Sequence, residues 1–587
     1  MRRGFVTHAS PSGIAVLVVT VVVAVVLSAA CPKPSPKTGK DGGKDAGGGS
    51  GGEATLFFTG DVRGEIEPCG CNSNPLGDLS RLAALIEDAG KTRGKGAVAW
   101  LDAGSLLYSE QPALSQGKRE QERLKADLIV EHASKLGLAA AGLGAYDLSD
   151  GKDQVRPPRQ AANVTPAEGV PLEIPRVLEL GGVKVGVFGL AAPDEMERVG
   201  VKASDPVAAA RSVVPALRKQ GAQVIVALTQ LNRADARKLA QENLGIDFIV
   251  AGRDTPDPSE TGGVLGKGIE KVGSAQVIVP ARRGQTVVRV DVHADGSAAG
   301  APLVDAYGEE RAKDRIAELA AMIAQQEQQV ARYKADPSAD ARFVAGQQKM
   351  IDDWKAESAD LAAHPLRRPA TGSWFTATQV AIQRKLRCDP EVVAAKRAFD
   401  KAAAAKNLAA AAGEKPRPVP AGSAGYAGID ECESCHKKAV DFWKTTHHAQ
   451  AWATLEHVGK EADRYCVSCH VTGWDAPGGA TLIGVTKQAT LRNVQCEACH
   501  GPASRHVDSD GKERTTLTRK PAETLCTGCH QKMHSDTFEY QAYLRDVTGP
   551  GHGEAFRKSL GDGATGHALR QAALDKAAQA VGEGCDR

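Results

Sequence analysis

The chain has 587 residues, of which 25% are charged, and its formal net charge is only +2. A chain of this length is expected to fold as several domains rather than one. The near-neutral charge argues against a nucleic-acid partner, which would require a clear excess of basic residues. Aromatic residues make up only 4% of the chain, and its C-terminal domain is poor in large apolar side chains.

The first 31 residues have the pattern of an export signal. Arg2 and Arg3 precede an apolar run from Gly13 to Ala30. The run ends in Leu27-Ser28-Ala29-Ala30-Cys31, which resembles a bacterial lipobox with Ser28 where Leu is usual. Cys31 is then the expected lipidated N-terminus, whereas without cleavage the run would act as a membrane anchor. Both readings predict a lipoprotein or anchored protein exposed on the periplasmic side of a bacterial membrane.

Residues 32–53 are mostly Lys, Gly, Pro, Ser and Asp and predict a flexible tether. Residues 54–300 then alternate apolar strands with amphipathic helices, as in an α/β domain. A hairpin is expected at Val177–Gly189, and an antiparallel pair is expected between Gln276–Val279 and Val287–Val292. The other expected strands are Ala54–Thr59, Ala97–Leu101, Val224–Leu228 and Asp247–Val250, and the expected helices are Leu79–Ala89, Glu122–Leu136 and Pro206–Gln220.

Residues 301–412 predict a helical hairpin followed by a helical connector. Apolar residues recur at three- and four-residue spacing on both sides of a turn at Pro337-Ser338. Another helix should begin at Asp389 as N-cap with Pro390 in its first turn. Residues 413–425 are a Pro- and Gly-containing linker, residues 426–550 form the next domain, and residues 551–587 form a partly helical tail.

Four C-x-x-C-H motifs follow one another in the segment 426–550. This spacing is the attachment signature of c-type haem, because the two thiols bind one porphyrin and the next His binds its iron. The sequence therefore predicts four covalently bound haem c groups, whose rings would supply much of the core of this domain. The attachment cysteines are Cys432, Cys435, Cys466, Cys469, Cys496, Cys499, Cys526 and Cys529, and the proximal iron ligands are His436, His470, His500 and His530.

Zinc binding and disulfides are the alternatives for paired cysteines. Structural zinc sites also use C-x-x-C pairs, but zinc gives no reason for His to follow every pair at the same offset. A disulfide across two residues is reducible and more typical of redox enzymes than of structural bridges. Haem attachment is therefore favoured. Cys388 and Cys585 follow no pattern and could pair or stay free.

The haem segment resembles the cytochrome c-554 family of multihaem cytochromes. Residues 443–455 read WKTTHHAQAWATL, residues 469–474 read CHVTGW and residues 494–506 read VQCEACHGPASRH. The resemblance implies haems in van der Waals range that pass electrons to their neighbours. It also implies that His448 and His506 are distal iron ligands. Weaker candidates for distal ligands are His447, His457, His534, His552 and His567.

The α/β domain resembles the metallophosphatase domain of the 5'-nucleotidase/UDP-sugar hydrolase family and its thiosulfohydrolase relatives. Five loops carry the resemblance, and they read FFTGDVRG (57–64), LDAGS (101–105), GLGAYD (142–147), VIVALTQL (224–231) and GRDT (252–255). The expected fold is thus multidomain: an α/β metallophosphatase-like sandwich of β-sheets flanked by helices, a helical hairpin region, and a mostly α or irregular multihaem cytochrome c domain.

The departures from this family predict a degenerate metal site. Its members bind two metal ions through these loops, but here only Asp61 keeps a ligating side chain. Because one carboxylate cannot hold two metals, ordinary phosphoesterase activity is not expected. The replaced positions are Arg63, Ser105, Leu143, Gly144, Gln230, Arg253 and Thr255.

A Cys-x-Cys pair, Cys69 and Cys71, follows directly after the first of these loops. Such a pair could be a redox dithiol, a soft-metal site or a handle for a sulfur substrate, or it could be inert. Arg63 and Arg253 nearby could lower a thiolate pKa or hold an oxyanion. Cys69 and Cys71 are therefore the candidate catalytic residues.

Three hypotheses follow from the sequence. The favoured one is a membrane-tethered tetrahaem electron carrier whose N-terminal domain binds a redox partner protein or a small oxyanion. The second is a reductase of a nitrogen or sulfur compound that uses an open haem iron or Cys69 and Cys71. The third is a residual hydrolase of the nucleotidase or thiosulfohydrolase type, against which the five altered loops argue.

Overall fold

The structure is a computed structural model that describes residues 51–68, 72–261, 265–296, 300–335, 341–578 and 581–585. The predicted export signal, Cys31, most of the tether and the pair Cys69 and Cys71 lie outside the described residues. In the part of the chain that is described, no helix is both long and apolar enough to cross a bilayer.

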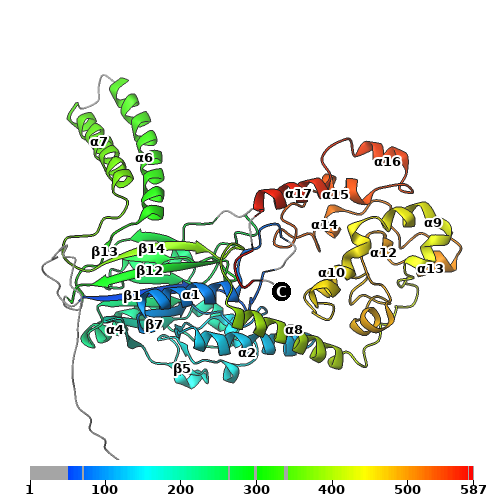
Figure 1. Cartoon of the computed structure of the whole chain (residues 1–587), viewed down its shortest axis with the longest axis horizontal. Coiled ribbons are helices and arrows are strands. Elements are labelled where there is room, and N and C mark those ends of the chain that lie inside the picture. The colour runs from blue at the N-terminus through cyan, green and yellow to red at the C-terminus, as the bar shows by residue number, and fades with distance from the viewer. Residues whose placement is uncertain are drawn as a thin grey trace, which may run out of the picture. The chain divides into compact units, whose positions relative to one another are not determined.

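Two six-stranded mixed sheets form the centre of the described N-terminal domain (Figure 1). The first has the order β13-β14-β12-β1-β2-β3, and the second has the order β10-β11-β9-β8-β7-β6. The strands of the first sheet are Gly52–Thr59 (β1), Val98–Asp102 (β2), Leu138–Ala141 (β3), Thr286–Ala294 (β12), Val304–Asp305 (β13) and Trp374–Ala381 (β14). Those of the second are Arg176–Leu180 (β6), Val183–Leu190 (β7), Val224–Thr229 (β8), Phe248–Ala251 (β9), Ile269–Val272 (β10) and Ala275–Ile278 (β11). The short strands Arg159–Gln160 (β4) and Leu172–Glu173 (β5) pair separately.

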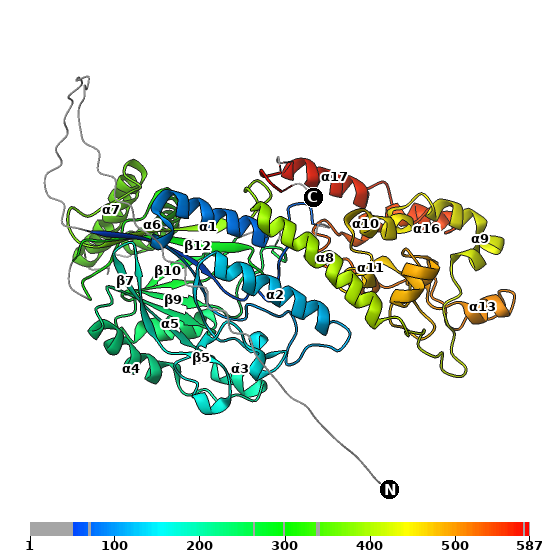
Figure 2. The ribbon, with the colours of Figure 1, turned by 60° about the horizontal axis from the view of Figure 1, so that its bottom comes forward.

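The two sheets pack face to face between two helical layers (Figure 2). Side chains alternate along β1, so Leu56 and Phe58 enter the core between the sheets while Phe57 faces the opposite side. The outer face of the first sheet is covered by α1 (Leu79–Arg93), α2 (Arg119–Lys135) and α8 (Pro390–Ala410), and that of the second by α4 (Pro206–Lys219) and α5 (Arg233–Gln241). The short helix Pro193–Arg198 (α3) follows β7. The predicted α/β sandwich flanked by helices is therefore confirmed.

One expectation about the sheet was wrong, and one strand was not predicted. Strands β11 and β12 do not pair with each other, because β11 lies in the second sheet and β12 in the first. The turn at Arg283 therefore connects the two sheets instead of closing a hairpin. In addition, β14 pairs along its whole length with β12, although it follows the helical hairpin in sequence. The hairpin is thus inserted between two strands of one sheet.

The predicted hairpin consists of α6 (Glu309–Ala335) and α7 (Ala341–Ala363), which project from this sheet (Figure 1). Leu319 and Leu361 are fully buried between the two helices. Arg315 and Glu357 form an ion pair across them, with 2.8 Å between Nε and Oε1. The predicted N-cap of α8 is also present, since the Asp389 side chain accepts a hydrogen bond from the amide of Val392.

The C-terminal domain consists of short helices joined by long irregular segments. Its small core includes Trp452, Leu455, Val467 and Leu482, so few apolar side chains hold the domain together. A disulfide between Cys388 and Cys585 joins the end of the chain to the loop before α8. The helices are Ile429–Trp443 (α9), Ala451–Val458 (α10), Val467–His470 (α11), Cys496–His500 (α12), Ser504–Asp508 (α13), Glu523–Cys526 (α14), Tyr540–Val547 (α15), Glu554–Ser559 (α16) and Gly566–Ala577 (α17).

Candidate haem centre and altered metal loops

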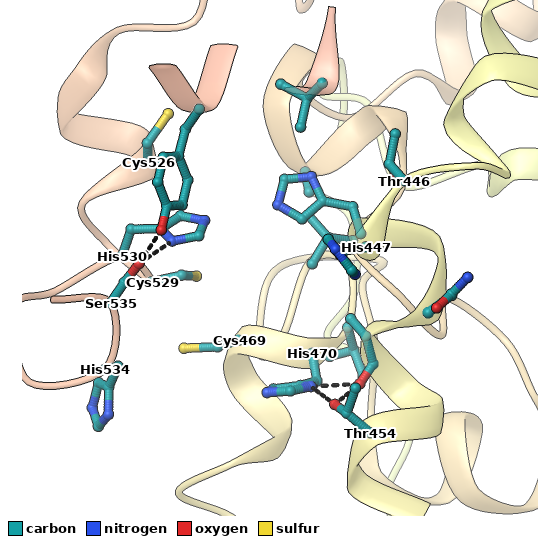
Figure 3. A pocket seen from close by; sticks show the side chains of 18 of the residues that line it. Thr446, His447, Thr454, Cys469, His470, Cys526, Cys529, His530, His534 and Ser535 are labelled. Carbon is teal, nitrogen blue, oxygen red and sulfur yellow. Dashed lines mark hydrogen bonds between the residues drawn. The ribbon is translucent and has the colours of Figure 1, made fainter. Parts of the chain in front are cut away.

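All four C-x-x-C-H motifs line one large cavity. The first motif lies in α9, which has a non-helical residue at His436, and the other three lie on or directly after α11, α12 and α14. The cavity has a volume of about 3660 Å³, several times that of a pocket for a single small ligand. Its size therefore fits several haem groups. Figure 3 shows part of its wall, where Cys469 and His470 face Cys526, Cys529 and His530.

The motifs meet in two pairs. The thiol of Cys432 lies close enough to that of Cys496 for each to act on the other's pKa, which brings the first motif beside the third. The thiols of Cys469 and Cys529 act on each other in the same way, which brings the second motif beside the fourth. Motif cysteines that are far apart in sequence are therefore neighbours in space.

Both predicted distal histidines face a motif histidine. The ring centres of His506 and His436 are 6.4 Å apart, with 21° between the ring planes. Those of His448 and His530 are 6.1 Å apart, with 44° between the planes. An iron between two imidazoles requires two bonds of about 2 Å plus about 1 Å within each ring, roughly 6 Å in all. Both pairs thus have the spacing that bis-histidine ligation requires.

Backbone carbonyls hold several of these rings by their Nδ1 atoms. The Nδ1 atom of His470 lies 2.6 Å from the carbonyl oxygen of Ala451. That of His500 lies 2.7 Å from the Thr518 oxygen, and that of His506 lies 2.8 Å from the Glu513 oxygen. A carbonyl can only accept, so Nδ1 carries the proton and Nε2 is left to bind a metal.

The surroundings of His448 keep its imidazole neutral. Burial, together with the neighbouring His530 and His447, lowers the pKa of His448 to about 4. A neutral imidazole is the form that binds a metal.

The weaker histidine candidates lie in different surroundings. His447 and His567 stack on each other, and 3.4 Å separates Nε2 of His447 from Nδ1 of His567, so these two atoms are too close to hold an iron between them. His457 is exposed on α10. Nδ1 of His534 is buried, and no hydrogen bond to it is found among the described residues. His552 packs against the ring of Phe442.

Hydrogen bonds occupy the five altered loops of the N-terminal domain. Arg63 binds Asp61 through both carboxylate oxygens, at 2.6 and 2.9 Å. Burial raises the pKa of Asp61, and the bonds from Arg63 oppose this rise. Ser105 donates to Gln230 over 2.8 Å. Nothing in the described part of the chain groups three or more His, Cys, Asp or Glu side chains for a metal ion.

Of the remaining altered positions, Thr255 reaches Asp61 but Leu143, Gly144 and Arg253 do not. Arg253 points to Asp194, with 2.7 Å between Nη1 and Oδ2, while Leu143 is fully buried in a separate apolar cluster. Gly144 donates its amide to Asp147, and Thr255 lies 3.4 Å from Asp61. Both arginines that could hold an oxyanion thus have carboxylate partners.

Residues 431–501 match the family model described as cytochrome c554 and c-prime. This segment resembles cytochrome c-554. The curated cytochrome c-554 of Nitrosomonas europaea is 33% identical over 141 residues, which are 19% of this chain and 59% of that protein. The chain therefore spans only part of that relative's length. The segment is accordingly similar to c-type cytochromes.

Solved structures of nucleotidase type match the N-terminal domain. A 5'-nucleotidase precursor of Thermus thermophilus gives a TM-score of 0.35 at 24% identity, over 41% of this chain and 51% of that one. The sulfate thiohydrolase SoxB of Thermus thermophilus gives 0.33 at 16% identity, over 41% and 53%. The matches thus include both kinds of protein that the sequence motifs resemble.

A buried charge cluster joins the c-554-like segment to the N-terminal domain. Lys460 Nζ lies 2.6 Å from Glu67 Oε1, contacts Asp400 of α8 and lies 3.8 Å from Asp463 Oδ2. Burial lowers the pKa of Lys460, but the three carboxylates outweigh it and hold that pKa above its usual range. Glu67 lies two residues before Cys69 in the sequence. Its ion pair with Lys460 therefore holds the chain just before the Cys-x-Cys pair against the c-554-like segment.

A tyrosine makes a second contact between the same two domains. Tyr465 is the residue before Cys466. Its hydroxyl oxygen lies 2.9 Å from both Glu122 Oε1 and Ser109 Oγ. Lys118 lies over the ring, 4.2 Å from its centre. Sequence analysis identified neither Lys460 nor Tyr465, because both depend on partners more than 300 residues away.

Proposed function

We propose that this chain is an exported, membrane-tethered tetrahaem c-type cytochrome that passes electrons between redox partner proteins on the periplasmic side of a bacterial membrane. The observation that carries the proposal is the single cavity lined by all four motifs, whose cysteines meet in two pairs. Bound haem c supplies a reversible one-electron iron couple. The proposal keeps the domain boundaries expected from the sequence. It adds strand β14 to the 54–300 domain, because β14 pairs with β12 in the first sheet.

The axial assignments follow from the ring spacings. His436 and His506 would hold one iron, and His530 and His448 another. Each motif's cysteines would fix one porphyrin edge, and the carbonyls that bind Nδ1 would keep the proximal rings in one tautomer and orientation. Filled axial positions suit electron transfer, since no coordination site is left for a substrate.

The N-terminal domain in this proposal has lost the dinuclear metal site and binds a redox partner. Its remaining ligand, Asp61, is paired with Arg63. Because Arg63 and Arg253 both have carboxylate partners, a small oxyanion would first have to displace one of them. Partner-protein binding is therefore better supported than oxyanion binding.

Haem counting combined with low-temperature electron paramagnetic resonance of the oxidised protein tests the proposal. We expect four haems per chain and low-spin ferric iron at the His436 and His530 motifs. Fewer haems, or zinc in place of iron, would contradict the proposed function.

A reductase is the second candidate, and one observation favours it. Rings of other histidines face His436 and His530, but no histidine ring contact is found for His470 or His500 among the described residues. An iron held by His470 alone would have an open position where a nitrogen or sulfur compound could bind. A high-spin ferric signal that disappears on adding such a compound would favour this candidate. The alternative based on Cys69 and Cys71 predicts instead that turnover is lost when both are replaced by Ser.

A further inference from the structure

The far end of the α6–α7 hairpin exposes two aromatic side chains that touch each other. Tyr333 near the end of α6 and Phe343 near the start of α7 stack edge to face, with 5.3 Å between ring centres. Tyr333 is 37% and Phe343 48% exposed, whereas Val330, about one turn closer to the sheet, is buried. Exposed apolar side chains are usually scattered singly. The two rings therefore form a small apolar surface beyond the buried core of the projecting hairpin (Figure 1).

Polar contacts hold the two helices together at this end. Gln326 Nε2 donates a hydrogen bond to Gln347 Oε1 over 2.7 Å, and Lys334 Nζ donates one to Gln348 Oε1 over 3.1 Å. Both bonds join α6 to α7. The aromatic surface is therefore carried by a hairpin end of defined shape.

Basic side chains surround the aromatic pair. Arg332 and Lys334 flank Tyr333, Arg342 precedes Phe343, and all three basic side chains are exposed. Residues 328–351, which we call the tip, contain four basic and two acidic residues, a net charge of +2. The two acidic residues of the tip are in the connection outside the described residues.

The rest of the hairpin carries the opposite charge. Residues 309–327 and 352–363, which we call the stem, contain nine acidic and four basic residues, a net charge of −5. Charge is thus divided along the hairpin axis, with the basic residues gathered around the exposed aromatic rings. An anionic surface would attract the tip and repel the stem.

The hairpin leaves the sheet at the edge where the N-terminal tether enters it. Strand β1 begins at Gly52, which pairs with Ala294 at the end of β12. At the same edge β14 begins at Trp374, beside Val304 of β13, and α6 follows β13 directly in the chain. After its other end, β1 continues to Arg63, which lines the cavity of the four motifs. The tether and the hairpin therefore share one edge of the first sheet, and the cavity is reached from the opposite edge.

The lengths of tether and hairpin allow both to contact one bilayer. Helix α6 has 27 residues, and at 1.5 Å per residue it is about 40 Å long. The roughly 20 residues between Cys31 and Gly52 can span at most about 70 Å. A lipid on Cys31 and the tip of the hairpin can therefore reach the same membrane surface.

We propose that the tip of the α6–α7 hairpin lies in the headgroup region of an anionic bilayer, as a second membrane contact beside the N-terminal tether. Aromatic rings and basic side chains are the groups that this layer favours. Because the same surface repels the stem, the hairpin stands on its tip and the cavity of the motifs is on the side of the domain away from the lipid, where a soluble redox partner can approach it. This inference rests on the membrane tethering in the proposed function.

Trypsin measures this contact, because Arg332, Lys334 and Arg342 are cleavage sites within the tip. Full-length holoprotein is added to preformed vesicles of phosphatidylethanolamine and phosphatidylglycerol, to vesicles of phosphatidylcholine alone, or kept in detergent. Cleavage in the tip is followed by mass spectrometry against cleavage at Lys558, which is 75% exposed in the C-terminal domain. We expect cleavage in the tip to slow at least about fivefold on the anionic vesicles and less on the neutral ones, while cleavage at Lys558 keeps its rate.

Replacing both aromatic residues, Tyr333→Ser with Phe343→Ser, should bring cleavage on anionic vesicles back to the rate of the same variant in detergent. Ile174→Ser is the matched control, because Ile174 is 81% exposed in the loop between β5 and β6, and it should leave the protection unchanged. Both variants change exposed side chains, and equal haem content confirms that each is folded.

Three results would overturn the contact. A wild-type tip that is cleaved equally fast on vesicles and in detergent, in protein that floats with the vesicles, would exclude the contact and leave the tether intact. Protein that does not float would exclude the tether of the proposed function as well. Protection that persists in detergent and rises with protein concentration would mean that a second copy of the chain, rather than a bilayer, covers the tip.

Discussion

Replacing Lys460 with Met should destabilise the protein strongly, because this lysine is the central cation of the interdomain cluster. Its side chain is only 10% exposed and contacts Glu67, Asp400 and Asp463, which are 12%, 16% and 13% exposed. Removing the cation that these buried carboxylates share costs about 3–5 kcal/mol, and Lys396, 3.6 Å from Glu67 Oε2, remains in place. We therefore expect Lys460→Met to lower the free energy of unfolding by that amount. Lys460→Arg keeps the positive charge and should retain most of the wild-type free energy of unfolding.

The matched control is Lys444→Met in the same domain. Lys444 pairs with Glu433 at 2.9 Å, but its side chain is 51% exposed, and surface pairs contribute only about 0–1 kcal/mol. Urea unfolding of the holoprotein, followed by tryptophan fluorescence and by haem absorbance, measures both variants. If Lys460→Met unfolds within about 1 kcal/mol of Lys444→Met, the cluster does not hold the two domains together and the reasoning is refuted.

Four further outcomes are expected. The carboxylates hold the pKa of Lys460 above its ordinary 10.5 despite burial. The stabilisation that Lys460 provides should therefore be complete at neutral pH and lost only as the pH rises above 10.5. The free energies of unfolding of wild type and Lys460→Met should converge at high pH, and a constant difference between them would contradict this. Replacing Cys388 and Cys585 by Ala should cost about 2–5 kcal/mol and speed proteolysis of the tail, whereas equal digestion rates would show that the disulfide is dispensable. Replacing Cys69 and Cys71 by Ser should leave four haems bound, as mass spectrometry of the intact protein can check. The purified protein supplied with Mn²⁺ should not hydrolyse phosphate monoesters at normal enzyme rates, and such turnover would mean that Asp61 still takes part in a metal site.

Local patterns predicted much of this molecule. The continuous apolar run Leu56, Phe57 and Phe58 is enough to identify a strand buried on both faces, and the Asp389-Pro390 step is enough to start a helix. The haem motifs could be recognised for the same reason, since the two thiols and the His that bind one porphyrin lie within five residues. The spacing of the motif therefore carries its chemistry without any knowledge of the fold.

Pairings between distant segments could not be predicted in this way. Strand β14 follows an inserted hairpin, and nothing in its own residues indicates that it joins β12 rather than a new sheet. The antiparallel pair expected for β11 and β12 failed because a short turn between two apolar runs is also compatible with a crossover between stacked sheets. In both cases the partner is chosen by packing of the whole sandwich.

The same limit separates the expected proximal from the expected distal haem ligands. His436 and His530 are identified by their neighbours in sequence, but His506 and His448 face them only because distant segments return to the cavity. For His552 the sequence did contain a signal, because Gly549, Pro550, Gly551 and Gly553 surround it. Such a run is usually read as a turn. Here its glycines allow close contact with α9, and that contact gives His552 a defined position against Phe442.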